Sequence, residues 1–150
     1  MLRARITAEM KEAMKAGEKQ KLSTVRMIQA ALKDRDIAAR GKGETSEEEI
    51  LALLQKMIKQ RQEAAGVYEQ GGRPELAESE RAEAEIIQTF LPQQLDDAEM
   101  RTAIADAIAE TGAESPKDMG KVIGALKGKY TGRMDFGRAS ALVKDALAAK

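Results

Sequence analysis

The sequence predicts an all-α fold, and three observations carry this prediction. Ala, Leu, Glu, Lys, Gln and Arg, which have high helix propensity, dominate the 150 residues. No segment alternates β-branched and polar residues, as a half-buried strand would. Apolar residues instead recur at every third or fourth position, which places them along one side of a helix. We therefore expect helices throughout the chain, separated by short breaks.

The first two expected helices lie on either side of Gly17. One runs from about residue 2 to 15, and the other runs from about 19 to 39, where Gly41-Lys42-Gly43 ends it. A side chain repeated every third or fourth residue returns to the same face, so these helices have one apolar side each. The residues expected to face the core are Leu2, Ile6, Met10, Met14, Leu22, Val25, Ile28 and Leu32.

The third and fourth expected helices are separated by Gly71-Gly72. Before the third, Ser46 and Glu49 have the spacing of a capping box, and the acidic first turn suits the positive end of a helix. Pro74 suits the first position of the fourth helix, because that position needs no N–H donor. The expected core residues are Ile50, Leu54, Met57, Ile58, Ala65, Tyr68, Ile86, Ile87, Phe90 and Leu91.

Pro92 marks the expected boundary between a four-helix N-terminal domain, residues 1–91, and a three-helix C-terminal domain, residues 92–150. Asp96 or Asp97 starts the fifth helix, and Ser115-Pro116 starts the sixth. Asp135 caps the seventh helix. The residues expected to face this second core are Met100, Ile104, Ile108, Met119, Val122, Ile123, Leu126, Tyr130, Phe136, Val143, Ala146 and Leu147.

The composition narrows the classes of function. The chain has no Cys and no His, so disulfides, thiolate chemistry, imidazole bases and the commonest metal ligands are all lacking. The N-terminus lacks the apolar stretch of a secretory signal, and no run of 18 apolar residues occurs. We therefore expect a cytoplasmic chain without membrane contact, cofactor, metal or catalytic site of its own.

The net charge of zero conceals an uneven distribution. Residues 1–42 carry a surplus of six positive charges and residues 115–150 a surplus of five, whereas 43–95 and 96–114 carry negative surpluses of six and five. Basic ends of this kind either meet phosphate or pair with the acidic middle of the same chain. Both alternatives remain open from the charge pattern.

Several short motifs, in order along nearly the whole chain, resemble the YqeY-like family. They are MKAGEK (14–19), LSTVRMIQAALK (22–33), KQR (59–61), GRPEL (72–76), FLPQQL (90–95) and KDMGKVIGAL (117–126). The last resembles the half that this family shares with the tail of the GatB subunit of tRNA-dependent amidotransferases. Met134 departs from the family, which often has a smaller residue at that position.

The resemblance implies an RNA-handling role rather than catalysis. In the amidotransferase, the tail of GatB helps to hold the tRNA, while the glutaminase and phosphorylating sites lie elsewhere. A free-standing chain of this type therefore resembles the RNA-handling part alone. A description as a carbon–nitrogen ligase with glutamine as donor would follow from family association only.

The sixth expected helix has two unlike sides. Met119, Val122, Ile123 and Leu126 share one side, and Lys117, Lys121, Gly124 and Gly128 share the opposite one. Glycine within a helix costs about 1 kcal/mol relative to alanine, and a bare backbone between lysines permits close approach of a phosphate–ribose chain. Two alternatives remain open: Gly128 as the helix C-cap, and Gly120 and Gly124 as packing sites for the N-terminal domain.

Further cations frame the turn between the last two helices. We predict an RNA-binding site, with tRNA as candidate ligand and little base readout, because exposed aromatic residues are scarce. Ordinary solvated charges are the alternative for these cations. The predicted site residues are Lys117, Lys121, Gly124, Lys127, Gly128, Lys129, Arg133 and Arg138.

Two other functions remain open. The charged surfaces would suit an adaptor that docks on an amidotransferase or an aminoacyl-tRNA synthetase. An autonomous amidase is the weakest hypothesis: Lys21 stands beside Ser23 and Thr24, but no motif supplies an oxyanion hole. The acidic residues of the middle segment are best explained as a solvated helix face.

Overall fold

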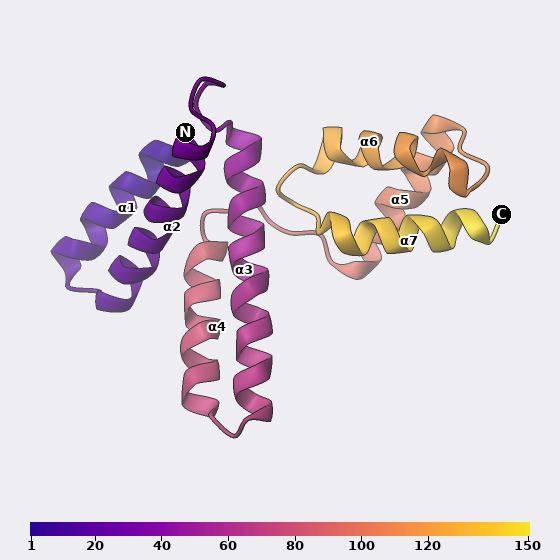
Figure 1. Ribbon diagram of the computed structural model, residues 1–150. Helices are drawn as coiled ribbons and strands as arrows, with labels where there is room; N and C mark the ends of the chain where they lie inside the picture. Colours follow the sequence, from indigo (N-terminus) through magenta and orange to yellow (C-terminus); the bar gives the residue numbers. More distant parts are fainter. The chain divides into compact units, whose positions relative to one another are not determined.

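The computed structural model describes residues 1–150 and confirms the all-α fold. The chain forms two compact units, Met1–Leu91 and Pro92–Lys150, and each is described by itself. The N-terminal unit contains α1 (Leu2–Ala16), α2 (Lys19–Ala38), α3 (Glu47–Gln70) and α4 (Pro74–Gln88). The C-terminal unit contains α5 (Asp97–Thr111), the short 3-10 helix η1 (Pro116–Asp118), α6 (Met119–Tyr130) and α7 (Phe136–Ala148) (Figure 1).

The N-terminal unit consists of two helical hairpins, α1–α2 and α3–α4 (Figure 1). Gly17 ends α1 with a φ of 70°, a left-handed conformation that glycine adopts without steric cost. Pro74 occupies the first position of α4, as the sequence predicts. The buried core of this unit consists of Leu2, Ile6, Val25, Ile28, Leu32, Ile50, Leu54, Met57, Ile58, Ala84, Ile87, Phe90 and Leu91.

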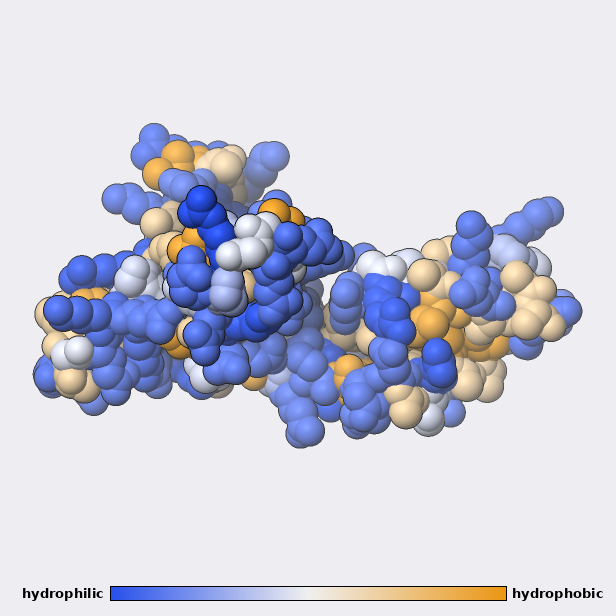
Figure 2. All heavy atoms as spheres, turned by 90° about the horizontal axis from the view of Figure 1, so that it is seen from below, coloured by the Kyte–Doolittle hydropathy of each residue, from blue (hydrophilic) through white to orange (hydrophobic).

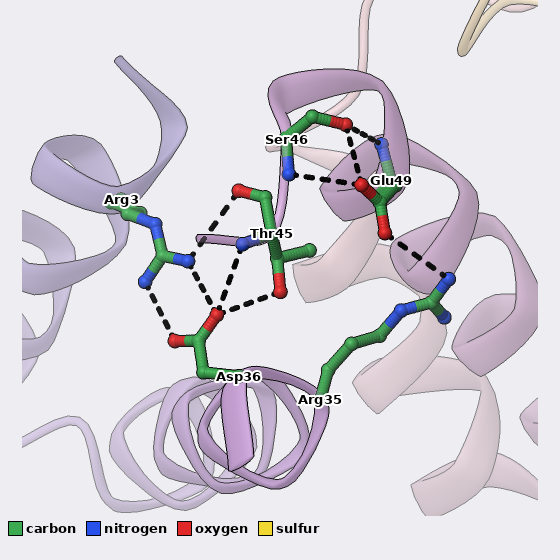
Figure 3. A network of polar contacts seen from close by, with 6 residues as sticks. All are labelled: Arg3, Arg35, Asp36, Thr45, Ser46 and Glu49. Carbon is green, nitrogen blue, oxygen red and sulfur yellow. Dashed lines mark hydrogen bonds and ion pairs between the residues drawn. The ribbon is translucent and has the colours of Figure 1, made fainter. Parts of the chain in front are cut away.

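A polar network holds the loop between α2 and α3 (Figure 3). The Arg3 guanidinium donates to both carboxylate oxygens of Asp36, at 3.0 and 2.7 Å, and the Thr45 hydroxyl donates to Asp36 Oδ1 at 2.7 Å. These hydrogen bonds hold the pKa of Asp36 well below its ordinary value. Ser46 and Glu49 form the expected capping box at the start of α3. The network thus joins α1, α2 and the beginning of α3.

The structure corrects two details of this unit. Met14 is half exposed, and Ala13 is buried in its place. An α-helix has 3.6 residues per turn, so a strict spacing of four turns progressively away from the core. The fourth helix ends at Gln88 rather than reaching Leu91, although Phe90 and Leu91 remain buried.

In the C-terminal unit, side-chain caps define the starts of α5 and α7. Asp96 and Glu99 form a capping box before α5, and Asp135 accepts hydrogen bonds from the N–H groups of Gly137 and Arg138 at the start of α7. The sixth helix differs from expectation, because a 3-10 turn at Pro116 precedes it. The buried core consists of Met100, Ala103, Ile104, Ala107, Ile108, Ala113, Val122, Leu126, Met134, Ala139, Val143 and Leu147.

The turn between α6 and α7 is part of this core. Gly132 has a φ of 78°, and the Leu95 N–H donates to the Arg133 carbonyl oxygen at 2.8 Å. Met134, the residue that departs from the family, is fully buried. Met134 is therefore part of the buried core of the C-terminal unit. None of the helices has the combination of length and hydrophobicity that crossing a membrane requires.

Candidate nucleic-acid interface

Helix α6 presents three glycines on its exposed side. Val122 and Leu126 are buried, whereas Gly120, Gly124 and Gly128 recur every fourth residue and are all exposed. A Cβ atom added to any of the three would meet no other group within 4 Å. Packing within the C-terminal unit therefore does not account for these glycines.

The C-cap explanation for Gly128 is wrong. Helix α6 continues to Tyr130, and its C-cap is Thr131, with a φ of −54°. Gly128 is also absent from the glycines with positive φ, whereas a left-handed glycine cap requires one. Gly128 therefore does not end the helix. Because it has no side chain, it leaves the helix backbone exposed at this position. Gly120 is not among the predicted site residues, and it extends the site by one helical turn. Its spacing of four residues from Gly124 is the feature of the sequence that could have identified it.

Three lysines flank this stripe, and their ammonium groups are accessible. Lys117, expected on the sixth helix, lies instead on η1 just before α6, and it is exposed, with no ion pair or hydrogen bond from its side chain in the structure. The Lys121 side chain is 70% exposed, and its Nζ lies 3.9 Å from Asp118 Oδ1, at the limit of an ion pair. The Lys127 Nζ lies 5.9 Å from the centroid of the Phe136 ring. We call these lysines, together with Gly120, Gly124 and Gly128, the lysine–glycine face.

The other three predicted cations have partners within the C-terminal unit. Lys129 Nζ donates to both carboxylate oxygens of Glu110, at 2.8 and 2.9 Å, and this contact raises the pKa of Lys129. The Arg138 guanidinium forms a two-point contact with the Asp97 carboxylate at 2.8 and 2.6 Å, which lowers the pKa of Asp97. These pairs agree with the alternative that some basic residues neutralise the acidic segment.

Arg133 has a structural partner of another kind. Its Nε donates to the Gln93 carbonyl oxygen at 3.0 Å, and its guanidinium lies 5.8 Å from the centroid of the Tyr130 ring. Tyr130 and Phe136 are partly buried and pack against the core of this unit. Both rings are thus occupied by the core and by cations. An exposed aromatic platform for base stacking does not form at this face.

The residues proposed for an amidase do not assemble into a nucleophilic site. Residues two apart on a helix point in nearly opposite directions, so Lys21 and Ser23 do not face each other. Lys21 Nζ lies 2.8 Å from the Glu9 carboxylate, whose hydrogen bond raises the pKa of Lys21. A lysine with a raised pKa remains protonated at neutral pH and is unsuited to act as a base. No group of three or more acidic side chains is placed to hold a metal ion.

The C-terminal unit also contains an apolar hollow between α5 and α7, with a volume of about 700 Å³. Ile104, Ile108 and Leu142 contribute to its lining, and Arg101, Asp145 and Lys150 are its charged members. Figure 2 shows hydrophobic and near-neutral residues between hydrophilic ones on the C-terminal unit. This hollow is separate from the lysine–glycine face, because none of its lining residues lies on α6.

The structure defines a small all-α protein of two helical units, with a basic, glycine-lined surface on one helix. The chain belongs to the YqeY-like family, whose model, described as Yqey-like protein, matches residues 3–147. The family expected from the sequence motifs is therefore confirmed.

The chain is also similar to fungal proteins named "Altered inheritance of mitochondria protein 41, mitochondrial". The protein of Pyrenophora tritici-repentis is 26% identical over 149 residues, covering 97% of this chain and 81% of the relative. That of Clavispora lusitaniae is 34% identical over 57% of this chain and 49% of the relative. That of Lachancea thermotolerans is 28% identical over 75% and 61%, respectively. The chain thus spans about half of the Clavispora protein and less than two thirds of the Lachancea protein.

These relatives overturn the expected cytoplasmic location, because each is named as a mitochondrial protein. The expectation depended on the absence of cysteine and of a secretory signal. Both observations argue against the secretory route, but neither distinguishes the cytoplasm from a mitochondrion. The composition therefore did not contain the information that the prediction required.

Proposed function

We propose that the chain is an RNA-binding accessory protein that contacts the tRNA backbone through the lysine–glycine face, which is formed by η1 and α6. The observation that carries the proposal is the stripe formed by Gly120, Gly124 and Gly128, which is exposed and open along its whole length. The resemblance of residues 117–126 to the GatB tail supports tRNA as the RNA. The chain would then resemble the RNA-holding part of an amidotransferase, with no catalytic step of its own.

The chemistry of the face suits phosphate rather than bases. Glycine exposes helix backbone, so a ribose–phosphate strand can approach more closely than a side chain would permit. Lys117, Lys121 and Lys127 provide positive charge around that backbone, and their ammonium groups are accessible. The lack of an open aromatic ring argues against base stacking. Recognition by backbone shape and charge, with little dependence on base sequence, is therefore expected.

The proposal is tested by titrating the protein with tRNA at several salt concentrations, with an unrelated structured RNA as control. Binding that prefers tRNA and weakens steeply with salt would support it, because each phosphate contact releases counterions. In the double variant Lys117→Glu/Lys121→Glu, affinity should fall at least about tenfold, and the log–log salt slope should decrease by about two.

A matched control variant distinguishes the effect of the lysine–glycine face from the effect of a change in net charge. The variant Lys11→Glu/Lys144→Glu makes the same change in net charge at two exposed positions outside the face. It should retain tRNA binding with the original salt slope. Equal weakening in both variants would overturn the site, and no tRNA binding even at low salt would overturn the function.

The second candidate function is a protein-binding adaptor, and the same glycine stripe favours it. A helix without side chains along one side also accepts another helix at short distance. An amidotransferase or an aminoacyl-tRNA synthetase is the partner class suggested by the GatB resemblance. A protein that remains bound to the purified chain after nuclease treatment, and is released by Gly124→Leu, would favour this alternative over RNA binding.

A further inference from the structure

Helix α2 has apolar residues on two opposite sides. Val25, Ile28 and Leu32 are buried in the core of the N-terminal unit. At 100° per residue, Met27 and Ala30 lie on the other side of the helix. Ile37 continues that outer side, with 49% of its surface exposed. Met27 packs partly against the edge of that core, whereas Ala30 and Ile37 are exposed, so the core alone does not account for the apolar second side.

The outer side of α2 forms the floor of a groove. Two hollows of about 430 and 420 Å³ have Met27 and Ala30 in common in their linings, and we treat them together as one depression along this side of α2. The first follows α2, and the second lies where α2 meets α3. Their apolar lining consists of Leu22, Met27, Ala30, Ala31, Leu53 and Met57. We call this depression the α2 groove.

The charges that line the α2 groove are mainly positive. Lys19, Arg26 and Lys56 are exposed and take part in no ion pair. Arg61 is engaged instead: its Nε lies 3.2 Å from the Glu83 carboxylate, and its Nη2 donates to the Met27 sulfur at 3.5 Å. Asp34 is the one carboxylate in the lining. An occupant with acidic residues would therefore meet three unpaired cations and one negative charge.

We propose that the α2 groove binds an amphipathic helix of a partner protein, with an apolar face for the groove and acidic residues beside it. The apolar floor suits the i, i+3, i+4 and i+7 anchors of such a helix. The methionine floor accommodates varied anchor side chains, because Met is flexible and polarizable. Lys19, Arg26 and Lys56 pair with the acidic residues and set the orientation of the helix.

The shape and lining of the groove distinguish this occupant from two others. A lipid bilayer presents a broad, nearly flat surface, which engages protruding apolar side chains better than a recessed floor. The phosphates of a nucleic acid would pair with the cations of the groove, but they would leave its apolar floor of Met27, Ala30 and Leu53 without a partner. An amphipathic peptide helix contacts both the apolar floor and the cations Lys19, Arg26 and Lys56.

The test is a selection from a displayed library of random peptides about four helical turns long. The full-length protein is the bait, and its variant Ala30→Glu is used for counter-selection. Ala30 is exposed and lies in the part of the groove common to both hollows, so Glu there obstructs the floor without entering the core. Selected peptides should have helical apolar spacing with flanking Asp or Glu.

Titration with one selected, fluorescently labelled peptide then separates the contributions of the apolar floor and of the cations to the binding affinity. Ala30→Glu should weaken binding at least about tenfold. Arg26→Glu/Lys56→Glu should weaken it similarly, and added salt should reduce the affinity of the unmodified protein. The controls use exposed positions of α1: Ala8→Glu is matched to Ala30→Glu, and Lys11→Glu/Lys15→Glu is matched in charge to the double variant. Both should leave the affinity unchanged. Circular dichroism establishes that each variant remains helical.

Four outcomes of the peptide and vesicle experiments would overturn the proposal, and sedimentation provides a fifth. The four are failure to enrich any peptide on the unmodified protein relative to Ala30→Glu, selected peptides that are basic, equal binding to all variants, and groove-dependent binding of phosphatidylcholine–phosphatidylserine vesicles. Sedimentation of the protein without peptide tests whether a second copy of the chain occupies the groove. A dimer that Ala30→Glu dissociates would assign the groove to self-association instead.

Discussion

At the scale of single residues, the Asp36 carboxylate connects separate segments of the N-terminal unit. It accepts hydrogen bonds from the Arg3 guanidinium and from both the hydroxyl and the N–H of Thr45. These contacts join residues that are up to 33 positions apart in the sequence. Because they lower the pKa of Asp36, the folded state favours its charged form more than the unfolded chain does.

This linkage predicts a specific response to acid. The contribution of Asp36 to the free energy of unfolding should be fully present above about pH 4, the ordinary pKa of a carboxyl group, and should decline as the pH falls toward its lowered pKa. Asp36→Asn lacks this contribution at neutral pH. Urea denaturation should therefore show a large difference between the two proteins at pH 7 and a smaller one near pH 2.

Asp34→Asn is the control for this prediction. Asp34 is exposed and has no ion pair in the structure, so its replacement should change the free energy of unfolding little at either pH. A difference between Asp36→Asn and the unmodified protein that stays constant from pH 7 to pH 2 would contradict the assigned cause.

At the scale of an element, the two sides of helix α6 differ in what they contribute to stability. Its buried side, with Val122 and Leu126, satisfies the usual requirement of an amphipathic helix. Its exposed side contains Gly120, Gly124 and Gly128, although alanine would fit at each position. Each glycine is therefore a local cost in helix stability that contacts within the C-terminal unit do not offset.

Gly124→Ala should raise the thermal stability of the C-terminal unit. The expected gain is about 0.5–1 kcal/mol, because alanine reduces the backbone entropy lost on folding and meets no neighbouring atom. The same variant should weaken tRNA binding by the proposed face, since a methyl group hinders close approach of the backbone. Thermal denaturation and tRNA titration on one sample measure both effects.

A matched change outside the face sharpens this comparison. Gly66→Ala lies within α3, where a Cβ also meets nothing within 4 Å. It should stabilise its helix by a similar amount and leave tRNA binding unchanged. A stabilised Gly124→Ala protein with full tRNA affinity would show that the glycine stripe has no part in RNA contact.

The whole molecule has two separate buried cores. The N-terminal cluster and the C-terminal cluster have no residue in common. The C-terminal unit has only residues 92–150 from which to build its core, and a domain of this size has little stability in reserve. A single cavity in this core should therefore remove a large fraction of the free energy of unfolding of the C-terminal unit.

Leu126→Ala should destabilise the C-terminal unit by about 3 kcal/mol, because Leu126 is fully buried between its helices. Amide hydrogen exchange should accelerate throughout residues 92–150 and remain slow in the core of the N-terminal unit. Ile28→Ala, in the other core, should give the reverse pattern. Equal acceleration in both units after either substitution would show that they unfold as one cooperative body.

The sequence by itself determined the all-α fold class, the family and most helix ends. Ser46, Asp96 and Asp135 cap their helices as expected, and Gly17 and Gly112 end theirs in left-handed conformations. These features were predictable because a cap or a glycine acts on backbone groups within a few residues of itself. Met14 departed from its predicted side because the apolar spacing was only approximately helical.

The tertiary structure decided which charges are accessible and which apolar side chains lack a cover. Lys129 is paired with Glu110, 19 residues away, and Arg138 with Asp97, 41 residues away, whereas Lys117 has no ion pair. The α2 groove likewise depends on where α3 lies against α2. Local sequence patterns do not contain this information, because it depends on which distant segments meet when the apolar faces pack together.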